Sequence, residues 1–326
     1  MKAVVITKAG EPEVLRLQEA PEPEMGPDDL LVDVKATALN RADLLQRRGG
    51  YPSPGDVRAE ILGLEMAGVV AKAGSRASGF KSGDRVFALL NGAGYAERVA
   101  INHAMALPIP ANLSFEQAAS IPEVFITVYD ALFNWCHLAM GERVLVHAAG
   151  SGVGVAATQL AREAGATTFG TAGSADKLRR AAELGLNVGI NYREQDFPVV
   201  VREQTKGQGV DVVLDVIGAP YFEKNIASMA VKGRMVLVGT MGGGKAEVNV
   251  GALMPKRLSV YGTVLRMRSL GEKIALTDQF RRHVLPLIER GRVVPVVDRV
   301  FPLAEASEAH RYMESNANFG KIVLKV

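Results

Sequence analysis

The sequence predicts an α/β fold built around a doubly wound parallel sheet, and two observations carry this prediction. Residues 143–166 contain an apolar β-branched run, a turn of small residues and an Ala-rich segment with helical spacing. After this stretch, strand-like and helix-like segments alternate up to about residue 263. Such alternation is typical of a parallel sheet that is covered by helices on both faces.

Each later element has its own signal. A helix at about 176–185 has Ser174 as its N-cap and ends at Gly185. Further helices are expected at about 196–206 and before Met229. Strands are expected at 167–171, 187–191, 211–218, 233–239 and 258–263. Together with the run before the turn they make six strands, which predicts a Rossmann domain.

The turn in this stretch has the features of a dinucleotide-phosphate site. Ala149, Ser151 and Gly154 occupy the three glycine positions of G-x-G-x-x-G, so only the last is glycine. Small residues let backbone N–H groups approach a pyrophosphate, and the helix N-terminus adds partial positive charge. We therefore expect these residues, with Gly152 and Val153, to bind the cofactor. An ordinary strand-turn-helix connection is the alternative.

Residues 1–110 differ, because short strand-like pieces are separated there by Gly, Pro and Asp. This spacing predicts a small irregular β-barrel, and the final KIVLKV adds a strand to it. We expect a discontinuous barrel domain at 1–122 and 263–326 and a Rossmann domain at 123–262. A cleft between the domains would hold the nicotinamide end of a cofactor.

Composition narrows the class of protein. The chain has 326 residues, 48% of them hydrophobic and 22% charged, which suits two packed domains. The net charge is only +3 without a block of basic residues, which argues against a nucleic-acid partner. One cysteine, no signal peptide and no long apolar run predict a cytoplasmic protein without a membrane partner.

Five segments carry a family resemblance that covers essentially the whole chain. They are ALNRADLLQRRGGYPSPG (38–55), ILGLEMAGVV (61–70), HAAGSGVG (147–154), INYRE (190–194) and ANFGKIVL (317–324). On these segments the chain resembles the zinc-independent quinone oxidoreductases of the medium-chain dehydrogenase/reductase superfamily, and within them the tumour-suppressor-inducible branch. The resemblance implies a GroES-like barrel domain, NADPH as cofactor, and a homodimer formed through the edge strand at 258–263.

The residues themselves argue against a metal site. Aligned on the zinc alcohol dehydrogenases, the three ligand positions hold Asn40, Leu64 and about Val124, while Glu65 is retained. A catalytic zinc needs three Cys, His or Glu ligands, and the five histidines show no ligand spacing. We therefore expect a metal-free enzyme.

Without zinc to polarise a carbonyl, hydride transfer needs an electron-poor acceptor such as a quinone or a conjugated enone. Tyr51 follows Gly49-Gly50, and the family places such a tyrosine beside the nicotinamide. We expect Tyr51 to hydrogen-bond the acceptor, Asn40 to contact cofactor or acceptor, and Thr127 to lie near the nicotinamide ribose. The alternatives are an aromatic plug in the barrel, a turn-forming Asn and an ordinary helical Thr.

The end of the second Rossmann strand predicts the choice of cofactor. NAD sites place Asp or Glu there for the ribose 2′-OH, whereas this chain has Ala172. Ser174 and Lys177 offer a hydroxyl and a positive charge to a 2′-phosphate, and the family uses a tyrosine at the position of Tyr192. NADPH is therefore the expected cofactor. Lys177 as an ordinary exposed helix lysine is the alternative.

The resemblance implies further cofactor contacts. They are Gly173, Ile217, Gly239, Thr240, Met241, Gly242, Leu265, Arg266 and Asn316. The run from Gly239 ends a strand at the carboxyl edge of the sheet, where ligands bind in such folds. A flexible hairpin is the alternative for this run, and a solvated basic face is the alternative for Arg266.

Three functions follow from these observations. The first is NADPH-dependent reduction of quinones by direct hydride transfer. The second is reduction of the C=C bond of enones or enoyl thioesters on the same scaffold. The third, of another class, is a cofactor-binding protein with a structural or RNA-binding role, against which the modest charge argues.

Overall fold

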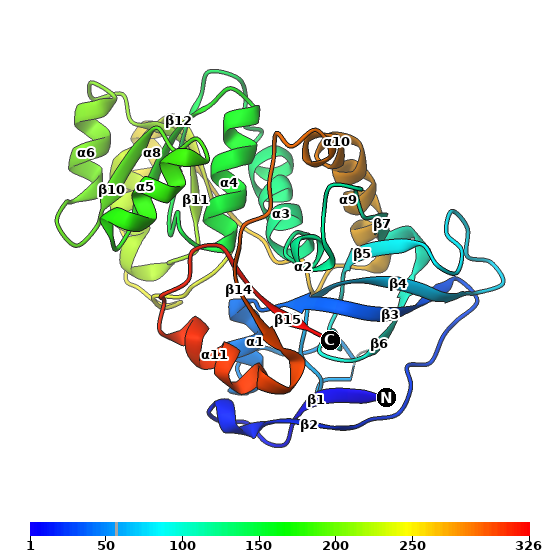
Figure 1. The fold of residues 1–326 in the computed structure, drawn as a ribbon. Helices are drawn as coiled ribbons and strands as arrows, with labels where there is room; N and C mark the ends of the chain where they lie inside the picture. The colour runs from blue at the N-terminus through cyan, green and yellow to red at the C-terminus, as the bar shows by residue number, and fades with distance from the viewer. Residues whose placement is uncertain (56–57) are drawn as a thin grey trace. The chain divides into compact units, whose positions relative to one another are not determined.

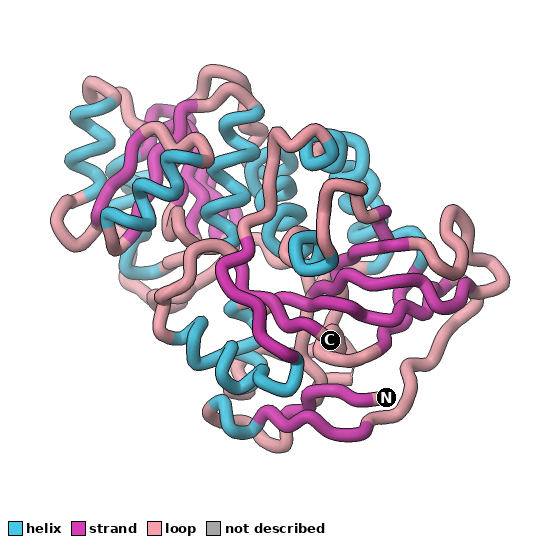
Figure 2. Tube along the Cα trace, viewed as in Figure 1, coloured by secondary structure: helices cyan, strands magenta, loops and turns pink. Residues whose placement is uncertain are grey.

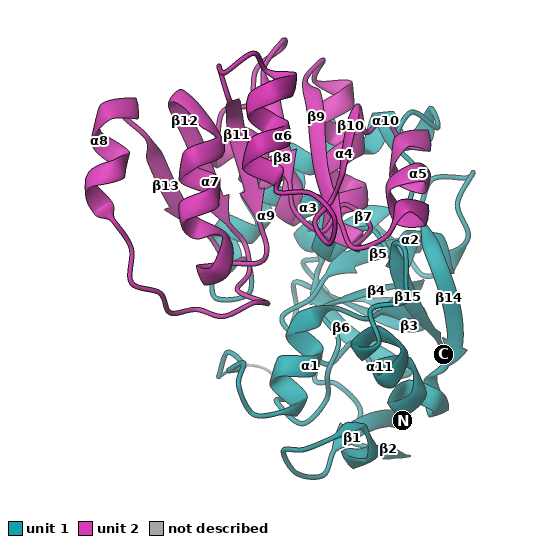
Figure 3. Ribbon diagram, turned by 90° about the vertical axis from the view of Figure 1, so that its left-hand side faces the viewer, with its two compact units in different colours: residues 1–126, 266–326 teal, residues 127–265 magenta. Residues whose placement is uncertain are grey.

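The computed structural model describes residues 1–55 and 58–326. The chain forms two compact units (Figure 3), the first from Met1–Ile126 and Arg266–Val326 and the second from Thr127–Leu265. The predicted domain boundaries at 122/123 and 262/263 stay a prediction.

The second unit contains a six-stranded sheet in which every neighbouring pair is parallel. The strand order is β10-β9-β8-β11-β12-β13, the Rossmann order with its topological switch beside β8, so the predicted fold is confirmed. The strands are β8 (Arg143–Val146), β9 (Thr167–Ala172), β10 (Val188–Asn191), β11 (Val210–Asp215), β12 (Met229–Leu237) and β13 (Ser259–Gly262).

Helices pack against this sheet (Figure 1). They are α4 (Gly152–Glu163), α5 (Ala175–Glu183), α6 (Phe197–Gln204), α7 (Phe222–Ser228) and α8 (Leu253–Lys256), with 3-10 turns at Ala219–Tyr221 and Val250–Ala252. Leu145, Phe169 and Val213 point from three neighbouring strands into one apolar cluster, where Phe197 of α6 also lies. Strands that are buried in this way read as continuous apolar runs, which is why the sequence reveals them.

The first unit is built mainly on antiparallel strands, and Figure 2 shows its strands in magenta. Its main sheet has the order β14-β15-β3-β4-β5-β7, in which only β14 and β15 are parallel. Strand β6 also pairs with β3 of this sheet, and β1 and β2 form a separate two-stranded sheet. The strands are β1 (Lys2–Ile6), β2 (Leu15–Glu19), β3 (Asp29–Ala38), β4 (Glu65–Ala73), β5 (Arg85–Leu89), β6 (Arg98–Asn102), β7 (Ala106–Pro108), β14 (Val297–Pro302) and β15 (Lys321–Lys325).

Helices of the first unit are α1 (Arg41–Arg47), α2 (Phe115–Ala119), α9 (Leu270–His283), α10 (Leu285–Glu289) and α11 (Ala306–Glu314). Short 3-10 turns lie at Pro12–Val14, His103–Met105 and Leu303–Glu305. Helix α3 (Pro122–Tyr129) leads from the first unit into the second, where a π-helical segment, Asp130–Trp135, continues it. No described helix has both the length and the apolar character that a membrane span requires.

Candidate active site

The phosphate turn connects β8 to α4. Ser151 caps α4, since its Oγ accepts from Gly154 N at 3.0 Å. Ala149 N donates to Thr171 O of β9 at 2.8 Å, which fixes the turn to the sheet. Among the described residues, the N–H groups of Gly152 and Val153 have no hydrogen-bond partner. Two free donors at the start of a long helix suit an anion.

Gly154 has a steric reason to be glycine. A Cβ there would lie 2.3 Å from Ala148 O and 2.6 Å from Ala149 Cα. This close approach brings the first turn of α4 against the strand end. The first two motif positions tolerate Ala149 and Ser151, which explains why only the last predicted position is glycine.

A second group of predicted residues meets at the ends of β9 and β10. Ser174 caps α5 by accepting from Lys177 N at 3.3 Å. A Cβ on Gly173 would lie 2.5 Å from the Tyr192 hydroxyl and 3.3 Å from Arg193 Nε. Tyr192 is 46% exposed. The structure thus brings a serine hydroxyl, a tyrosine hydroxyl and a lysine backbone close to one strand end that bears no acid.

A buried polar network underlies these turns, and the sequence alone did not predict it. His147 contacts Thr171 Oγ1 at 3.0 Å and Asn225 Oδ1 at 2.7 Å. Asn225 donates to Asp215 Oδ2 at 3.0 Å, and Asp215 accepts from Ile217 N at 2.6 Å. Burial lowers the pKa of His147 to about 4, so the ring is neutral. One sequence signal for this network was available. A polar residue stands at the end of each of two buried strands: His147 directly after β8 and Asp215 as the last residue of β11.

The Gly239–Gly242 segment follows β12 and is tied to the end of β11. Met241 N donates to Val216 O at 3.0 Å, and Gly242 N donates to Ile217 O at 2.8 Å. Thr240 and Met241 are exposed, while Leu265 at the end of the unit is buried. The segment is therefore anchored to the sheet edge by backbone hydrogen bonds.

In the first unit, Tyr51 lies against Arg266. The guanidinium carbon of Arg266 lies 5.2 Å from the centre of the Tyr51 ring. Arg266 is 4% exposed and donates to Gln46 Oε1 at 2.7 Å, Ser53 Oγ at 2.8 Å and Asn91 O at 2.8 Å. The interpretation of Arg266 as a solvated basic face is therefore wrong. Burial raises the pKa of the Tyr51 hydroxyl to about 12.

Asn40 is enclosed in a buried charged cluster. Its Nδ2 donates to Glu65 Oε1 at 2.8 Å, and its Oδ1 accepts from Lys321 Nζ at 2.7 Å. Lys321 Nζ also lies 2.7 Å from Glu65 Oε1. The amide of Asn40 is thus engaged by protein groups on both sides. We name Asn40, Glu65 and Lys321 the Lys321 cluster.

The remaining predicted residues lie elsewhere in the chain. Asn316 is exposed with a φ of +56° and accepts from Arg41 Nη2. Thr127 lies in α3, four residues after Glu123, so the two share one face of that helix. Glu123 N donates to Glu65 Oε2 at 2.8 Å. Glu123 was not predicted, although it is the sole charged residue in 118–129.

Comparison with known proteins places this geometry in a family. Two family models match: the alcohol dehydrogenase GroES-like domain at residues 26–111 and zinc-binding dehydrogenase at 184–324. The rat quinone oxidoreductase is 31% identical over 329 residues, with 99% of this chain and 97% of the relative covered. This chain belongs to the quinone oxidoreductases of the medium-chain dehydrogenase/reductase superfamily.

Two solved structures align with this quinone oxidoreductase family member along its whole length. The Escherichia coli quinone oxidoreductase complexed with NADPH has a TM-score of 0.88 and 33% identity, with 100% of both chains covered. A structure described as an NAD-dependent alcohol dehydrogenase has a TM-score of 0.90 and 36% identity, also with 100% of both chains covered. The descriptions of these two structures name different cofactors and different reactions. The residues of the site must therefore indicate which cofactor and which reaction suit this chain.

The residues of this family member do not fit a catalytic zinc ion. The Lys321 ammonium contacts Asn40 and Glu65, so a positive charge already lies against the polar groups of the former ligand region. Leu64 carries no ligand atom. Among residues 1–55 and 58–326, no three His, Cys, Asp or Glu side chains are grouped so that they could hold a metal.

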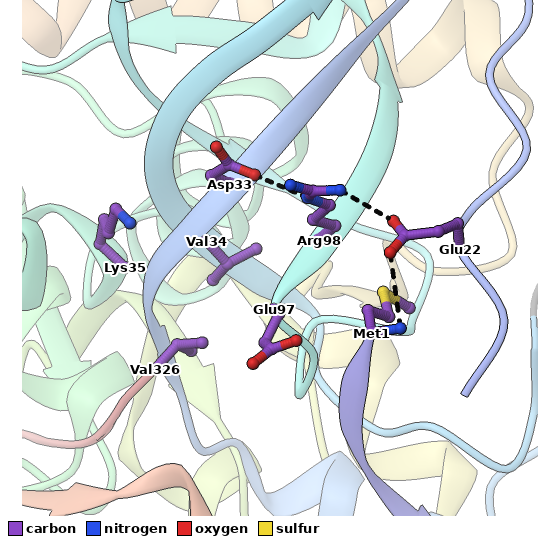
Figure 4. A pocket seen from close by; sticks show the side chains of 8 residues that line it. All are labelled: Met1, Glu22, Asp33, Val34, Lys35, Glu97, Arg98 and Val326. Carbon is purple, nitrogen blue, oxygen red and sulfur yellow. Dashed lines mark hydrogen bonds and ion pairs between the residues drawn. The ribbon is translucent and has the colours of Figure 1, made fainter. Parts of the chain in front are cut away.

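One hollow of about 520 Å³ lies in the first unit and contains none of the predicted residues (Figure 4). Arg98 crosses it, with Nε 2.8 Å from Asp33 Oδ1 and Nη1 3.4 Å from Glu22 Oε2. Glu22 Oε1 also lies 3.4 Å from the amino group of Met1. Because its charges compensate one another, we assign no function to this hollow.

Proposed function

We propose that the protein is an NADPH-dependent quinone oxidoreductase that transfers hydride directly to a quinone, without a metal. The Lys321 cluster is the observation that carries this proposal. It puts a fixed ammonium against Asn40, the residue aligned with a zinc ligand of the alcohol dehydrogenases, so these residues would not hold a metal that polarises an alcohol or a simple carbonyl. A quinone does not need that help, because its conjugated carbonyls delocalise the incoming charge.

The choice of NADPH is supported by the end of β9. Ala172 leaves no carboxylate to bond a ribose 2′-OH or to repel a 2′-phosphate. Ser174 and Tyr192 would supply hydroxyls to a 2′-phosphate, and Lys177, whose backbone N–H donates to Ser174 Oγ, would supply an ammonium. An NAD-specific site would place an acid here, and this outweighs the likeness to the NAD-dependent structure.

The bound cofactor would supply a hydride from nicotinamide C4, and the chain would hold it in place. The free N–H groups of Gly152 and Val153 would bind the pyrophosphate. The anchored segment from Gly239 to Gly242 and the turn at Ile217 would contact the nicotinamide half. Leu265, Arg266, Asn316 and Thr127 remain proposed cofactor contacts. Asn40 we now propose as a positioning residue, since its amide is already engaged.

Tyr51 would orient the acceptor. Its ring is held by Arg266, and among the described residues its hydroxyl has no hydrogen-bond partner. With a pKa of about 12 the hydroxyl stays protonated across the working pH range. It can therefore donate a hydrogen bond to an acceptor carbonyl, which strengthens as negative charge develops on that oxygen.

The test is an NADPH-oxidation screen over quinones, conjugated enals and an enoyl-CoA, with simple alcohols and NADP⁺ in the reverse direction. We expect turnover of quinones with NADPH, slower turnover with NADH, and no alcohol oxidation. Faster turnover of enals or of the enoyl-CoA would move the function to C=C reduction. Tight NADPH binding without turnover of any acceptor would favour the structural or RNA-binding role.

We also propose a homodimer. Strand β13 pairs only with β12, so its outer edge carries no partner in the described sheet. Such an edge can pair with the same strand of a second copy. Sedimentation equilibrium should give twice the chain mass of 34.8 kDa, and a monomer at micromolar concentration would reject this proposal.

A further inference from the structure

Arg266 is a buried arginine without an acid to pair with. It is the residue at which the chain re-enters the first unit, and it is only 4% exposed. Among the described residues, no carboxylate lies within ion-pair distance of its guanidinium. A guanidinium that is taken out of water is ordinarily paired with a carboxylate. The hydrogen bonds of Arg266 go mostly to an uncharged loop instead.

This one guanidinium contacts three consecutive residues of the loop. Its carbon lies 5.2 Å from the centre of the Tyr51 ring. Nη1 donates to Pro52 O at 3.3 Å, and Nη2 donates to Ser53 Oγ at 2.8 Å. Nη1 also donates to Gln46 Oε1 at 2.7 Å, and Gln46 Nε2 donates to Ser53 Oγ at 3.1 Å. Arg266 and Gln46 therefore both bind the hydroxyl of Ser53.

The backbone of this loop has no hydrogen bonds of its own. Helix α1 ends just before it, where Gly49 has a φ of +79° and Gly49 N donates to Gln46 O at 2.9 Å. Among the described residues, residues 51–55 take part in no backbone–backbone hydrogen bond. Side-chain contacts must then fix the position of the loop. The position of the Tyr51 ring therefore depends on the guanidinium that contacts it.

Arg266 is itself held by groups outside the loop. Its Nε donates to Asn91 O at 2.8 Å, and its carbonyl oxygen accepts from Lys273 Nζ at 2.6 Å. Lys273, in helix α9, is 3% exposed and also donates to Asn91 Oδ1. Four of the five N–H groups of the guanidinium thus have protein acceptors. A side chain that is restrained in this way can hold a neighbouring loop in one position.

Resting on the proposed function, we propose that Arg266 is the positioning residue that orients the Tyr51 hydroxyl toward the acceptor. The guanidinium stacks on the ring and, through Pro52 and Ser53, holds the backbone that carries it. This role suits an arginine better than a lysine, because the planar fork binds several acceptors at once and stacks on aromatic rings. Arg266 acts on hydride transfer only through Tyr51, so the balance of the reaction is unchanged.

The positioning role and the proposed cofactor contact of Arg266 predict different results. Loss of a cofactor contact would weaken the binding of NADPH, whereas loss of a positioning residue would lower kcat/KM for the acceptor. Among the described residues, only one N–H group of the guanidinium is left without an acceptor, which favours the positioning role. The effect is also limited in size. Through the Tyr51 hydroxyl it cannot exceed the contribution of that hydrogen bond, which is about tenfold.

The test is Arg266→Lys, which keeps the positive charge but loses the fork, made in the wild type and in Tyr51→Phe. We expect kcat/KM for quinone to fall by about tenfold or less, with the Kd for NADPH unchanged. In Tyr51→Phe the same substitution should cause almost no further loss, since no hydroxyl is left to misplace.

Two further variants accompany this test. Ser53→Ala removes one acceptor of the guanidinium from a half-buried loop position, so the variant should fold. It should show a smaller loss of kcat/KM that likewise disappears in Tyr51→Phe. Arg290→Lys, at an exposed arginine that follows α10, is the matched control and should behave as the wild type does.

A second measurement is independent of turnover. With 3-fluorotyrosine in place of the seven tyrosines, the fluorine NMR signal that is missing from Tyr51→Phe belongs to Tyr51. In the protein without cofactor, Arg266→Lys should move this signal toward its position in the unfolded chain. An unchanged signal, an unchanged kcat/KM, weaker NADPH binding as the main effect, or a loss that adds to that of Tyr51→Phe would overturn the positioning role. If the wild type reduces no quinone or enone, the proposed function fails, whereas a shifted signal would still support the restraint of Tyr51 by Arg266.

Discussion

The ammonium of Lys321 lies 2.7 Å from the Glu65 carboxylate in the interior of the first unit, where the two side chains are 5% and 0% exposed. The same ammonium donates to Leu39 O and Asn40 Oδ1, each at 2.7 Å. All three of its protons therefore have acceptors. The pair joins the last strand, β15, to the start of β4, and it fixes the carboxylate that holds the backbone of Glu123.

Replacing Lys321 by methionine should strongly destabilise the protein. The change would leave Glu65 as an unpaired charge at a site with no exposure, and breaking a buried pair in this way costs about 3–5 kcal/mol. Denaturant titration of Lys321→Met against the wild type measures the free energy of unfolding. Lys325→Met, at the exposed end of the same strand, is the control. Equal stability of all three proteins would show that the pair contributes little.

Removal of metal should not affect the activity. Because Leu64 and the Lys321 ammonium cannot bind zinc, we expect full quinone reduction after dialysis against a chelator. Elemental analysis of the purified protein should give far less than one zinc per chain. Stoichiometric zinc whose loss abolishes turnover would contradict the zinc-independent assignment.

Changing Tyr51 to phenylalanine should lower kcat/KM for quinones by about tenfold or less, because a single neutral hydrogen bond contributes roughly 0.5–1.5 kcal/mol. The affinity for NADPH should stay the same, since the hydroxyl addresses the acceptor. Steady-state kinetics over several quinones and a fluorescence titration with NADPH provide the two values. Tyr261→Phe, which removes a hydroxyl from β13, is the control. Wild-type kinetics on every quinone would exclude a role for the Tyr51 hydroxyl.

The stability of the protein should fall as pH decreases from 6.5 to about 4, the ordinary and the folded pKa values of His147. Between these values the unfolded chain binds a proton that the buried ring does not, so acid favours unfolding by up to about 1.4 kcal/mol per pH unit. His147→Gln should show a shallower loss over the same window. Chemical denaturation at pH 4–7 measures both slopes, with the exposed His283→Gln as control. Parallel curves would show that His147 is not the group that titrates.

Local sequence signals were sufficient to predict the fold of the second unit. Its strands are apolar runs with turns at both ends, and Ser174 is the N-cap that was predicted. Strand β12 begins at Met229 and not at the predicted Gly233, because Met229 pairs with Val210 before the register shifts and Arg234 resumes the ladder. In the first unit β14 was missed, since its residues are mostly half-buried or exposed and its sequence lacks a clear alternation.

The candidate site was predictable only where local sequence defines it. Ser174 and Lys177 are neighbours in one helix turn, and Tyr192 joins them because β9 and β10 are parallel strands that end together. The Lys321 cluster instead joins residues from the two ends of the chain. No local pattern shows that these side chains meet.

The relative affinity for NADPH and NADH tests directly whether the 2′-phosphate binds at the end of β9. Lys177→Ala should weaken NADPH binding by about ten- to a hundredfold, since charge-assisted hydrogen bonds contribute roughly 1.5–3 kcal/mol and each 1.4 kcal/mol is tenfold. The lower value is expected because Lys177 is only half-buried. NADH binding should hardly change, because NADH has no 2′-phosphate. Lys224→Ala, an exposed lysine in α7, is the control.

Ala172→Asp should also shift the cofactor preference from NADPH toward NADH, but for a different physical reason. A carboxylate at the end of β9 repels a 2′-phosphate and offers an acceptor to the 2′-OH of NADH. We therefore expect weaker NADPH binding and tighter NADH binding in this variant, whereas Lys177→Ala loses only the NADPH contact. Dissociation constants of both cofactors at fixed ionic strength separate the two mechanisms. Equal losses for NADPH and NADH, or no loss for either, would mean that the 2′-phosphate binds away from Ser174, Lys177 and Tyr192.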